Sequence, residues 1–264
     1  TAITGGEFNG TVFNNSSILG GTFHGPVVNT TMGRIVNGTF KNSVENNKII
    51  ENGTFNDEVK NNGIIENGAF HKAVENNGTI NDGTFNDEVV NTTMGRIEDG
   101  TFHKPVENDG TIEKGTFNDA VKNNSTIENG TFNGPVDNTA SGTIEKGTFN
   151  GAVENNGIIE NGAFHKAVKN NATINDGMFN DAVENNGTIE KGTFHDEVKN
   201  DGIINGGTFN GAVTSSGTVS GSITGSGTLN GKPITQTPEP EPEPEPEPKP
   251  EPEPKPNPEP QPEP

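Results

Sequence analysis

Three large apolar residues recur in a fixed order along most of this chain, and each is flanked on both sides by small or polar residues. The unit is clearest in Thr111–Ser125 (TIEKGTFNDAVKNNS). Side chains alternate across a β-strand, so the centre of a triplet such as Thr-Phe-Asn points one way and its neighbours point the other. The pattern predicts short strands with one inward face. In this unit and the next, the predicted core residues are Ile112, Phe117, Val121, Ile127, Phe132 and Val136.

Phenylalanine marks the period of the repeat. From residue 23 to residue 209 the steps between repeat phenylalanines are 15 residues, except for three steps of 17. The residues are Phe23, Phe40, Phe55, Phe70, Phe85, Phe102, Phe117, Phe132, Phe149, Phe164, Phe179, Phe194 and Phe209. Self-similarity at a fixed period is the signature of a repeat architecture. The pattern can be traced over roughly residues 8 to 213.

Strands explain this period better than helices do. Each unit carries one or two glycines, several asparagines and β-branched residues, all of which disfavour a helix. Turn formers separate the apolar triplets, such as Lys114-Gly115 and Asn123-Asn124 in the unit above. We therefore predict an all-β fold, a single-chain β-solenoid (parallel β-helix) with about 15 residues per coil. Three strands and three corners per coil would make it roughly triangular, with Ile, Phe and Val filling its interior.

Two columns of alternating charge support one unit per coil. From Phe55 to Phe117 the second residue after each Phe changes sign from unit to unit: Asp57, Lys72, Asp87, Lys104 and Asp119. From Val153 to Val198 the residue after each Val does the same: Glu154, Lys169, Glu184 and Lys199. Stacked units would place these side chains about 4.8 Å apart on adjacent strands. Opposite charges are favourable there and like charges are not.

An asparagine column follows the valines. Stacked Asn amides can hydrogen-bond along the axis of in-register β-structures. The predicted structural ladder comprises Asn46, Asn61, Asn76, Asn108, Asn123, Asn155, Asn170, Asn185 and Asn200.

The pattern divides the chain into four segments. Residues 1–22 form an irregular N-terminal cap or first coils, 23–213 the regular solenoid, and 214–237 degenerate C-terminal coils or a cap. In residues 238–264 every second residue is Pro, interleaved with nine Glu and two Lys. Such a run favours an extended polyproline II-like tail, a stiff spacer of roughly 80 Å at ~3.1 Å per residue.

The three 17-residue steps all carry their two extra residues at the same corner, between Val and Ile. The segments read VVNTTMGRI at residues 27–35 and 89–97, and VDNTASGTI at residues 136–144. They would project from one edge of the rod, either as tolerated insertions or as a contact surface. The candidate contact residues are Thr30, Thr31, Met32, Thr92, Thr93, Met94, Thr139, Ala140 and Ser141.

Composition narrows the function classes. The chain has 264 residues, a formal charge of −20, only 26% hydrophobic residues and no cysteine. Disulfides and thiolate metal sites are therefore excluded. The net negative charge disfavours binding to nucleic acid, because the phosphates would be repelled. No apolar run approaches the ~20 residues of a membrane span. The chain starts at Thr1 and not at Met, which indicates a processed protein or an excised fragment.

Candidate chemistry is confined to repeated columns. The five histidines all follow a Phe, and within the regular part none lie on adjacent coils, so no pair can share one ion. We interpret His24, His71, His103, His165 and His195 as outward alternatives to Asn. A glutamate column after Ile could bind Ca²⁺ loosely or form a solvated acidic stripe. It comprises Glu51, Glu66, Glu98, Glu113, Glu128, Glu145, Glu160 and Glu190. Catalysis needs a local, irregular constellation, so we expect no enzyme, no catalytic residue, no metal and no cofactor.

A threonine column precedes Phe in most units, as in Thr101, Thr116 and Thr131. This column resembles the Thr arrays of β-solenoid antifreeze proteins, which match ice. Those proteins usually present two Thr per strand, whereas here the partner position is Asn or His. Ice binding is an alternative function.

The layout as a whole resembles the exposed part of a bacterial surface adhesin. The repeats GTFNDAV and GTIENG, followed by PEPEPEPKP, are similar in arrangement to autotransporter passengers and wall-anchored repeat proteins. The resemblance implies a non-enzymatic structural or adhesive rod displayed on a bacterial surface. Its partner would be a surface ligand: a glycan, a protein or ice. End-to-end self-association into a filament is a further alternative, since solenoid ends are open strand edges.

Overall fold

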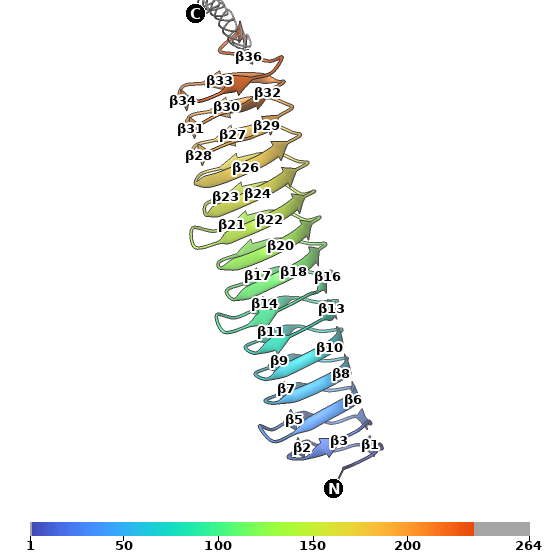
Figure 1. The fold of residues 1–264 in the computed structure, drawn as a ribbon. Helices are drawn as coiled ribbons and strands as arrows, with labels where there is room; N and C mark the ends of the chain where they lie inside the picture. The colour runs from blue at the N-terminus through green and yellow to red at the C-terminus, as the bar shows by residue number, and fades with distance from the viewer. Residues whose placement is uncertain (1, 235–264) are drawn as a thin grey trace, which may run out of the picture.

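The chain folds into an elongated all-β rod, in which successive turns stack from one end to the other (Figure 1). The computed structural model describes residues 2–234. It confirms the predicted fold class, a β-solenoid of about 15 turns with about 15 residues per turn. The predicted polyproline tail at residues 238–264 and the last three residues of the predicted C-terminal cap lie outside the described residues.

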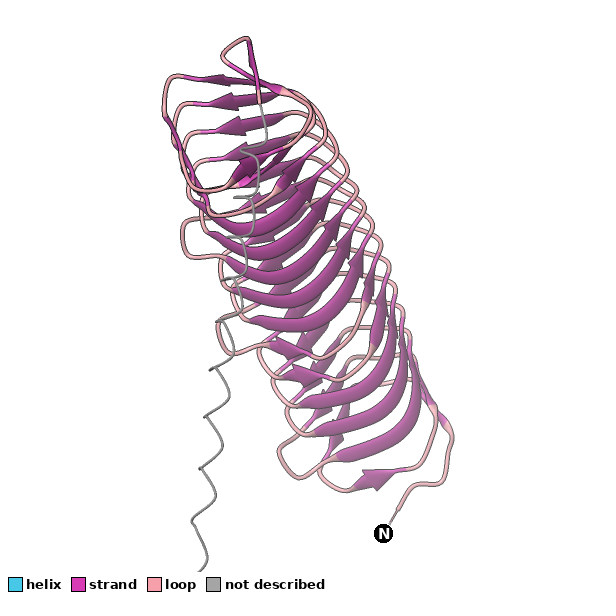
Figure 2. Ribbon diagram, turned by 45° about the horizontal axis from the view of Figure 1, so that its top comes forward, coloured by secondary structure: helices cyan, strands magenta, loops and turns pink. Residues whose placement is uncertain are grey.

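Two parallel sheets run along the rod, and their strands are seen edge to edge in Figure 2. Sheet A has 21 strands and carries the Ile and Phe positions. They are β1 (Glu7–Phe8), β3 (Ser17–Ile18), β4 (Thr22–Phe23), β6 (Arg34–Phe40), β8 (Ile49–Phe55), β10 (Ile64–Phe70), β12 (Thr79–Ile80), β13 (Gly83–Phe85), β15 (Arg96–Ile97), β16 (Thr101–Phe102), β18 (Thr111–Phe117), β20 (Thr126–Phe132), β22 (Thr143–Phe149), β24 (Ile158–Phe164), β26 (Thr173–Phe179), β28 (Thr188–Ile189), β29 (Thr193–Phe194), β31 (Ile203–Ile204), β32 (Gly207–Phe209), β34 (Thr218–Val219) and β35 (Ile223–Thr224).

Sheet B has 16 strands and carries the Val and Asn positions. They are β2 (Val12–Asn14), β5 (Val27–Asn29), β7 (Val44–Asn46), β9 (Val59–Asn61), β11 (Val74–Asn76), β14 (Val89–Asn91), β17 (Val106–Asn108), β19 (Val121–Asn123), β21 (Val136–Asn138), β23 (Val153–Asn155), β25 (Val168–Asn170), β27 (Val183–Asn185), β30 (Val198–Asn200), β33 (Ala212–Ser215), β36 (Thr228–Leu229) and β37 (Lys232–Pro233).

One sequence unit makes one turn of the solenoid. Strand β18 pairs in parallel with β20, and Phe117 lies opposite Phe132. The longer steps keep this register, because Phe85 on β13 lies opposite Phe102 on β16 although 17 residues separate them. The two extra residues are therefore absorbed outside the sheets.

The predicted three strands per turn occur in some turns, such as the one formed by β12, β13 and β14, but not in all of them. In several turns the Ile and Phe segments form one continuous strand, as in β18, which runs through the expected corner at Lys114-Gly115. Gly115 has a steric role there, since a Cβ at this position would lie 2.7 Å from Cζ of Phe117. The glycine lets the backbone pass over the aromatic ring. The expected turn residue is a packing residue within a strand.

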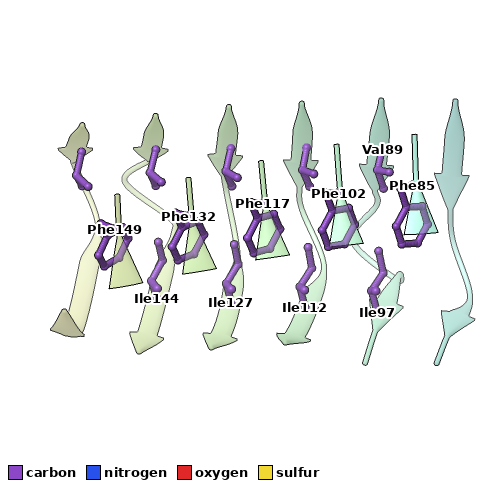
Figure 3. Packing of buried hydrophobic residues seen from close by; sticks show 14 of the residues in the cluster. Phe85, Val89, Ile97, Phe102, Ile112, Phe117, Ile127, Phe132, Ile144 and Phe149 are labelled. Atoms are coloured by element: carbon purple, nitrogen blue, oxygen red, sulfur yellow. The ribbon is translucent and has the colours of Figure 1, made fainter. Parts of the chain in front are cut away.

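The core is a column of stacked aromatic rings lined by Ile on one side and Val on the other (Figure 3). From Phe8 to Phe209, neighbouring ring centroids are 4.7–5.0 Å apart and the ring planes differ by 2–10°. That spacing equals the distance between adjacent strands, so each ring stacks on the next without distorting the sheets. The six core residues named from the sequence are buried: Ile112, Phe117, Val121, Ile127, Phe132 and Val136.

The repeat register extends further toward the N-terminus than the sequence pattern indicated. Ile3 bridges to Ile18, and Phe8 and Val12 pair with the equivalent residues 15 positions later. Phe13 is not one of the repeat phenylalanines of the core. It occupies the outward position after Val12 and is 68% exposed. Residues 3–14 thus form a first turn of the rod. At the other end, β36 and β37 form an antiparallel hairpin that closes sheet B.

Candidate functional site

The three inserted corners share one backbone geometry. Each is a four-residue turn in which the glycine N–H donates to the carbonyl of the first residue, for example Gly95 to Thr92 at 2.8 Å. The Thr92 hydroxyl donates back to the carbonyl of Asn76 on the preceding turn, at 3.1 Å. Thr30 and Thr139 make the equivalent bond. Three of the nine candidate contact residues therefore anchor their corner to the rod.

The other six candidates are exposed at the tips of the corners: Thr31, Met32, Thr93, Met94, Ala140 and Ser141. Met32 and Met94 are 72% and 77% exposed. The loops that follow β5, β14 and β21 project from the same edge of the rod (Figure 1). They are separated by four and three turns in sheet B, or about 19 and 14 Å. The structure thus places the predicted residues along one edge as three separate projections.

An arginine follows the first two corners and lies against the glutamate column. The Arg34 guanidinium pairs with Glu51, and the Arg96 guanidinium pairs with Glu98 and Glu113. In these pairs the arginine side chains are about half exposed. The third corner has Thr143 at the equivalent position and lacks this charge. The first two corners therefore present a Met and a cation together, and the third presents only small residues.

The predicted asparagine column is a fully buried hydrogen-bonded ladder. Each Nδ2 donates to Oδ1 of the Asn one turn later, as from Asn108 to Asn123 at 2.9 Å, and all these bonds point the same way. The last bond, from Asn200, goes to the Ser215 hydroxyl. The full ladder comprises Asn14, Asn29, Asn46, Asn61, Asn76, Asn91, Asn108, Asn123, Asn138, Asn155, Asn170, Asn185 and Asn200. Sequence reasoning missed the four members that lie in the first turn or beside an inserted corner.

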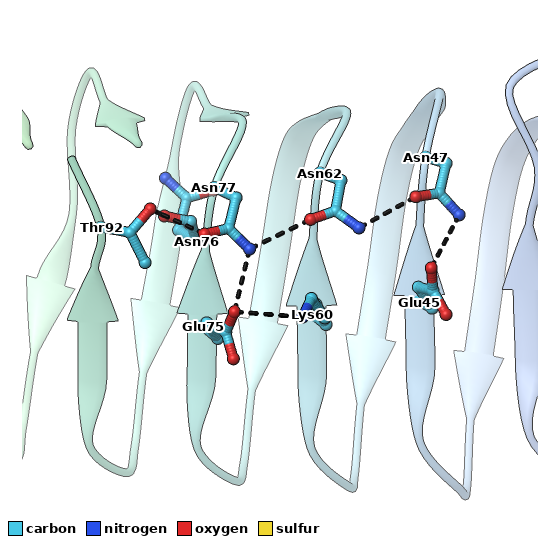
Figure 4. Close-up of polar contacts among 8 residues, drawn as sticks. All are labelled: Glu45, Asn47, Lys60, Asn62, Glu75, Asn76, Asn77 and Thr92. Atoms are coloured by element: carbon cyan, nitrogen blue, oxygen red, sulfur yellow. Dashed lines mark hydrogen bonds and ion pairs between the residues drawn. The ribbon is translucent and has the colours of Figure 1, made fainter. Parts of the chain in front are cut away.

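A second asparagine column lies outside the first and runs in the opposite direction (Figure 4). The Asn77 amide donates to Asn62, and Asn62 donates to Asn47, at 3.0 and 2.9 Å. The single proton of the Thr92 hydroxyl is shared between the Asn76 carbonyl and Oδ1 of Asn77, which lies closer, at 2.7 Å. The inserted corner is therefore tied to this outer column.

The charge column after Val forms the expected ion pairs between adjacent turns. The Nζ–Oε1 distance is 2.7 Å for Lys122 and Glu107, and 2.9 Å for Lys169 and Glu154. Lys60–Glu75 and Lys199–Glu184 are longer pairs of the same kind. The hydrogen bond from Lys122 lowers the pKa of the Glu107 carboxyl and raises the pKa of Lys122.

The charge column after Phe does not form the ion pairs between adjacent turns that its alternating sign predicted. Among residues 2–234, no ion pair joins Asp57, Lys72 or Asp87. The aspartate carboxylates instead accept the backbone N–H of the next residue, as in Asp57 with Glu58 at 3.0 Å. Asp119 accepts the N–H of Ala120 at 2.8 Å in the same way. A local turn contact has replaced the expected contact between turns.

We predict that replacing Lys122 with glutamine raises the pKa of Glu107 toward its ordinary value. The stability that Glu107 contributes is present above the ordinary glutamate pKa of about 4.3 and is lost as the pH falls through the lowered folded value. The pair is exposed, so the effect on unfolding is small. Carboxyl ¹³C NMR titration measures the pKa directly. The matched variant Lys169→Gln should leave the pKa of Glu107 unchanged, and an equal shift in both variants would contradict the pairing.

The histidines occupy an outward Asn column, in line with their interpretation from sequence. Nδ1 of His71, His103, His165 and His195 lies 3.1–3.3 Å from the Asn amide one turn later. Among the described residues, no group of three or more His, Cys, Asp or Glu side chains is placed to hold a metal ion. The same part of the chain contains no helix long and apolar enough to span a membrane.

The threonine column lies in register on the outer face of sheet A. Thr101 and Thr116, for example, lie opposite each other on adjacent strands. Ala69, Ala163 and Met178 interrupt the column at the equivalent position. The longest continuous run is Thr84, Thr101, Thr116, Thr131 and Thr148.

Sequence reasoning missed a long groove of about 870 Å³ on the outer face of sheet B. Its floor is the column of residues one position before each core Val: Pro105, Ala120, Pro135, Ala152, Ala167 and Ala182. Glu88 and Glu197 occupy the same column at its two ends, and the charged column after Val lines one side. The sequence signal that could have indicated this groove is the recurrence of Ala or Pro directly before the core Val in successive units. Such a floor can contact a linear ligand along several turns.

The continuous sheets and the buried Phe and Asn ladders define the class of this protein: it is a β-solenoid repeat protein with an asparagine ladder. Comparison with known family models, with curated proteins and with solved structures gives no match for this chain.

Proposed function

We propose that this chain is a non-enzymatic structural or adhesive rod, displayed on a bacterial surface, which holds contact residues away from that surface. The observation that carries the proposal is the unbroken core. The aromatic stack from Phe8 to Phe209 has thirteen consecutive steps of about 4.8 Å, so one rigid column extends for roughly 60 Å. Length and stiffness are what a stalk requires.

The extracellular bacterial location rests on the resemblance of the repeats and the Pro-Glu segment to surface adhesins. The absence of catalysis is proposed because the acidic side chains and histidines belong to repeated columns. A repeated column presents the same group at every turn, whereas an active site needs different groups converging on one reacting atom.

The inserted corners are the proposed contact surface. They are the places within the regular turns where the rod departs from its period, and each is fixed to the rod by a half-buried hydroxyl contact while its tip stays exposed. Exposed methionines adapt to irregular partner surfaces, because the thioether side chain is flexible and polarizable. A glycan or a protein on another cell surface is the proposed ligand.

The test shortens each corner to the form that the regular turns already use. In the middle corner, the four residues Thr92–Gly95 are replaced by Asn-Gly, copied from Asn77–Gly78 on the preceding turn. The other two corners are changed in the same way. We expect an unchanged rod by small-angle scattering and circular dichroism, and at least tenfold weaker binding to arrays of host-surface glycans and extracellular matrix proteins.

The matched control is Ala152→Glu, which adds a charge to the groove on sheet B. The groove is the other surface that could bind the ligand. Loss of binding in this variant alone would move the contact surface to the groove and contradict the role of the corners. Equal binding by all variants would contradict both. Thermal hysteresis or ice shaping by the unmodified chain would favour the ice-binding alternative over an adhesive rod.

A further inference from the structure

Two of the three inserted corners present the same side chains. The nine residues 27–35 and 89–97 are identical, whereas the residues beside them differ: HGP precedes the first corner and NDE precedes the second. The residues that follow differ too, with VNG after the first corner and EDG after the second. The identity is therefore confined to the corners, and it includes their exposed positions.

An outward valine adjoins each of these two corners. Val28 and Val90 stand directly after a core Val, in the column where most turns carry a charged residue. Both valines are half-buried, and the methionines at the corner tips, Met32 and Met94, are largely exposed. The third corner carries an aspartate and a serine at these positions. The first two corners thus each offer an apolar contact that the third lacks.

A second groove on the outer face of sheet B, of about 580 Å³, lies between the two identical corners. This short groove is lined by residues of β7, β9, β11 and β14, whereas the first corner follows β5 and the second follows β14. Val90 and Thr92 line its end at the second corner, and Glu45, Lys60 and Glu75 form one row along it (Figure 4). Four strand spacings, or about 19 Å, separate the two corners along the rod.

The short groove is acidic. Its ionisable lining consists of four glutamates and one lysine, a formal charge of −3: Glu45, Glu58, Glu75, Glu88 and Lys60. Lys60 pairs with Glu75, and all five side chains belong to exposed residues. Within residues 2–234 the other three carboxylates form no ion pair. A basic ligand would therefore meet carboxylates that the rod itself does not neutralise.

The same lining disfavours other occupants. The Pro-Glu segment at residues 238–264 contains nine Glu and two Lys, and a second copy of the chain carries a formal charge of −20, so both would be repelled. A neutral glycan has no cation to match the carboxylates. None of the residues that line the short groove is aromatic, so a sugar ring would find no π face on which to stack.

We propose, on the basis of the function proposed above, that the first two corners and the short groove form one binding site for an extended basic segment of a partner protein. Such a segment would carry apolar residues at positions i and i+6 and basic residues at i+2 and i+4. In an extended chain these four side chains share one face, and six residues span about 20 Å. That length matches the distance between the corners.

The placement of the corners assigns a contact to each position of the ligand. Its two apolar side chains would contact the methionine and the outward valine of each corner. Its two basic side chains would lie near Glu45 and Glu58, on the two turns that follow the first corner. Because the rod holds the corners at a fixed separation, binding at one corner raises the effective concentration of the ligand at the other.

The first test uses a fluorescently labelled synthetic peptide, LSRSRSL, which carries this pattern. We expect saturable binding by fluorescence anisotropy, and the affinity should fall as the salt concentration rises. The peptide LSESESL reverses the charge, and LSRSRSSL turns the second leucine to the opposite face of the extended chain. Each should bind at least tenfold more weakly. Equal binding of LSRSRSL and LSRSRSSL would overturn the proposal.

The second test changes exposed residues of the rod. Met32→Ser and Met94→Ser should each weaken binding of LSRSRSL at least fivefold, because each removes one of the two apolar contacts. The double variant Glu45→Gln, Glu58→Gln should weaken it at least tenfold and reduce its salt dependence. The matched control Glu197→Gln alters a glutamate in the same column as Glu58 but outside the short groove, and it should leave binding unchanged. An equal loss in the control would contradict the site.

Shortening single corners separates this site from the general adhesive role. Replacing the first or the second corner alone with Asn-Gly should weaken binding of LSRSRSL at least tenfold, and replacing the third alone should have no effect. Equal binding by the three variants, or no binding by the unmodified chain, would overturn the site, whatever the variant with three shortened corners does on the arrays. Unchanged array binding by that variant, with LSRSRSL binding lost, would contradict the adhesive role of the corners and support the peptide site.

Discussion

Replacing Asn123 with aspartate is expected to destabilise the rod by about 3–5 kcal/mol at neutral pH, as expected for a buried charge without a partner. In the native chain the Asn123 amide nitrogen donates to Oδ1 of Asn138 and to the carbonyl of Ser125, each at 2.9 Å. Its oxygen accepts from Asn108. Aspartate keeps the accepting oxygen but replaces the donating nitrogen with a second negative oxygen, which would face three acceptors: Oδ1 of Asn138 and the carbonyls of Ser125 and Thr143. Chemical denaturation measures the loss.

The expected destabilisation depends on pH in a direction that identifies its cause. An unpaired buried carboxylate has a folded-state pKa above its unfolded value of about 3.9. Stability is therefore lost as the pH rises through the folded pKa, and most of it returns at pH values below the unfolded pKa, where the protonated group can again donate one hydrogen bond. Denaturation midpoints for the variant and the parent chain should converge as the pH falls toward 4.

The matched control is Asn129→Asp, the same chemical change on the outside of the rod. Asn129 is exposed and lies between Lys114 and Lys146 on the adjacent strands of sheet A. A carboxylate there gains two cationic neighbours, so stability should stay within about 0.5 kcal/mol of the parent chain. Equal losses in the two variants would contradict the idea that the buried ladder distinguishes an amide from a carboxylate.

The stacking of turns could be predicted because the sequence itself repeats. A residue such as Phe117 has the same neighbours in every unit, so its place in the core follows from period and alternation alone. The asparagine ladder could be predicted for the same reason. Its members beside the inserted corners, such as Asn91 and Asn138, were not predicted, although the two extra residues come after them in the sequence. They stand two residues after Val89 and Val136, as the other members do after their Val, and the pairing of β14 and β21 with their neighbours confirms their place in the column.

Other features could not be obtained from the pattern, because they depend on side-chain size and local competition. Gly115 resembles a turn residue in sequence, and only the position of the Phe117 ring shows that a Cβ cannot fit. The alternation of Asp57 and Lys72 is as regular as that of Glu107 and Lys122. A short aspartate side chain, however, can reach its own following N–H, and this local bond replaces the longer contact between turns.

The candidate contact surface was predicted in position but not in detail. The 17-residue steps located the three corners on one edge, and they indeed project there. Sequence could not separate Thr92, whose hydroxyl is used within the rod, from Thr93 and Met94, which are exposed. The groove on sheet B was missed because its floor is made of alanine and proline, residues that carry no chemistry of their own.

Deleting 30 residues in phase is expected to damage the fold less than deleting one residue out of phase. Removal of residues 158–187 takes out two complete turns and joins Gly157 to Thr188, the junction that Gly187 makes in the native chain. Phe149 would then stack on Phe194, and Glu154 would face Lys199, which preserves both the core and the charge alternation. The rod should remain folded and shorten by about 10 Å.

Deleting Thr116 alone, in contrast, is expected to destabilise the rod. This residue separates Gly115 from Phe117 within β18, and its loss either turns Phe117 outward or brings Lys114 inward. Neither arrangement matches the adjacent turns, and the loss of one buried ring costs about 3–5 kcal/mol. Thermal unfolding by circular dichroism, with rod length from small-angle scattering, measures both variants. If the 30-residue deletion unfolded as readily as the single deletion, stability would depend on the particular turns removed and not on their shared register.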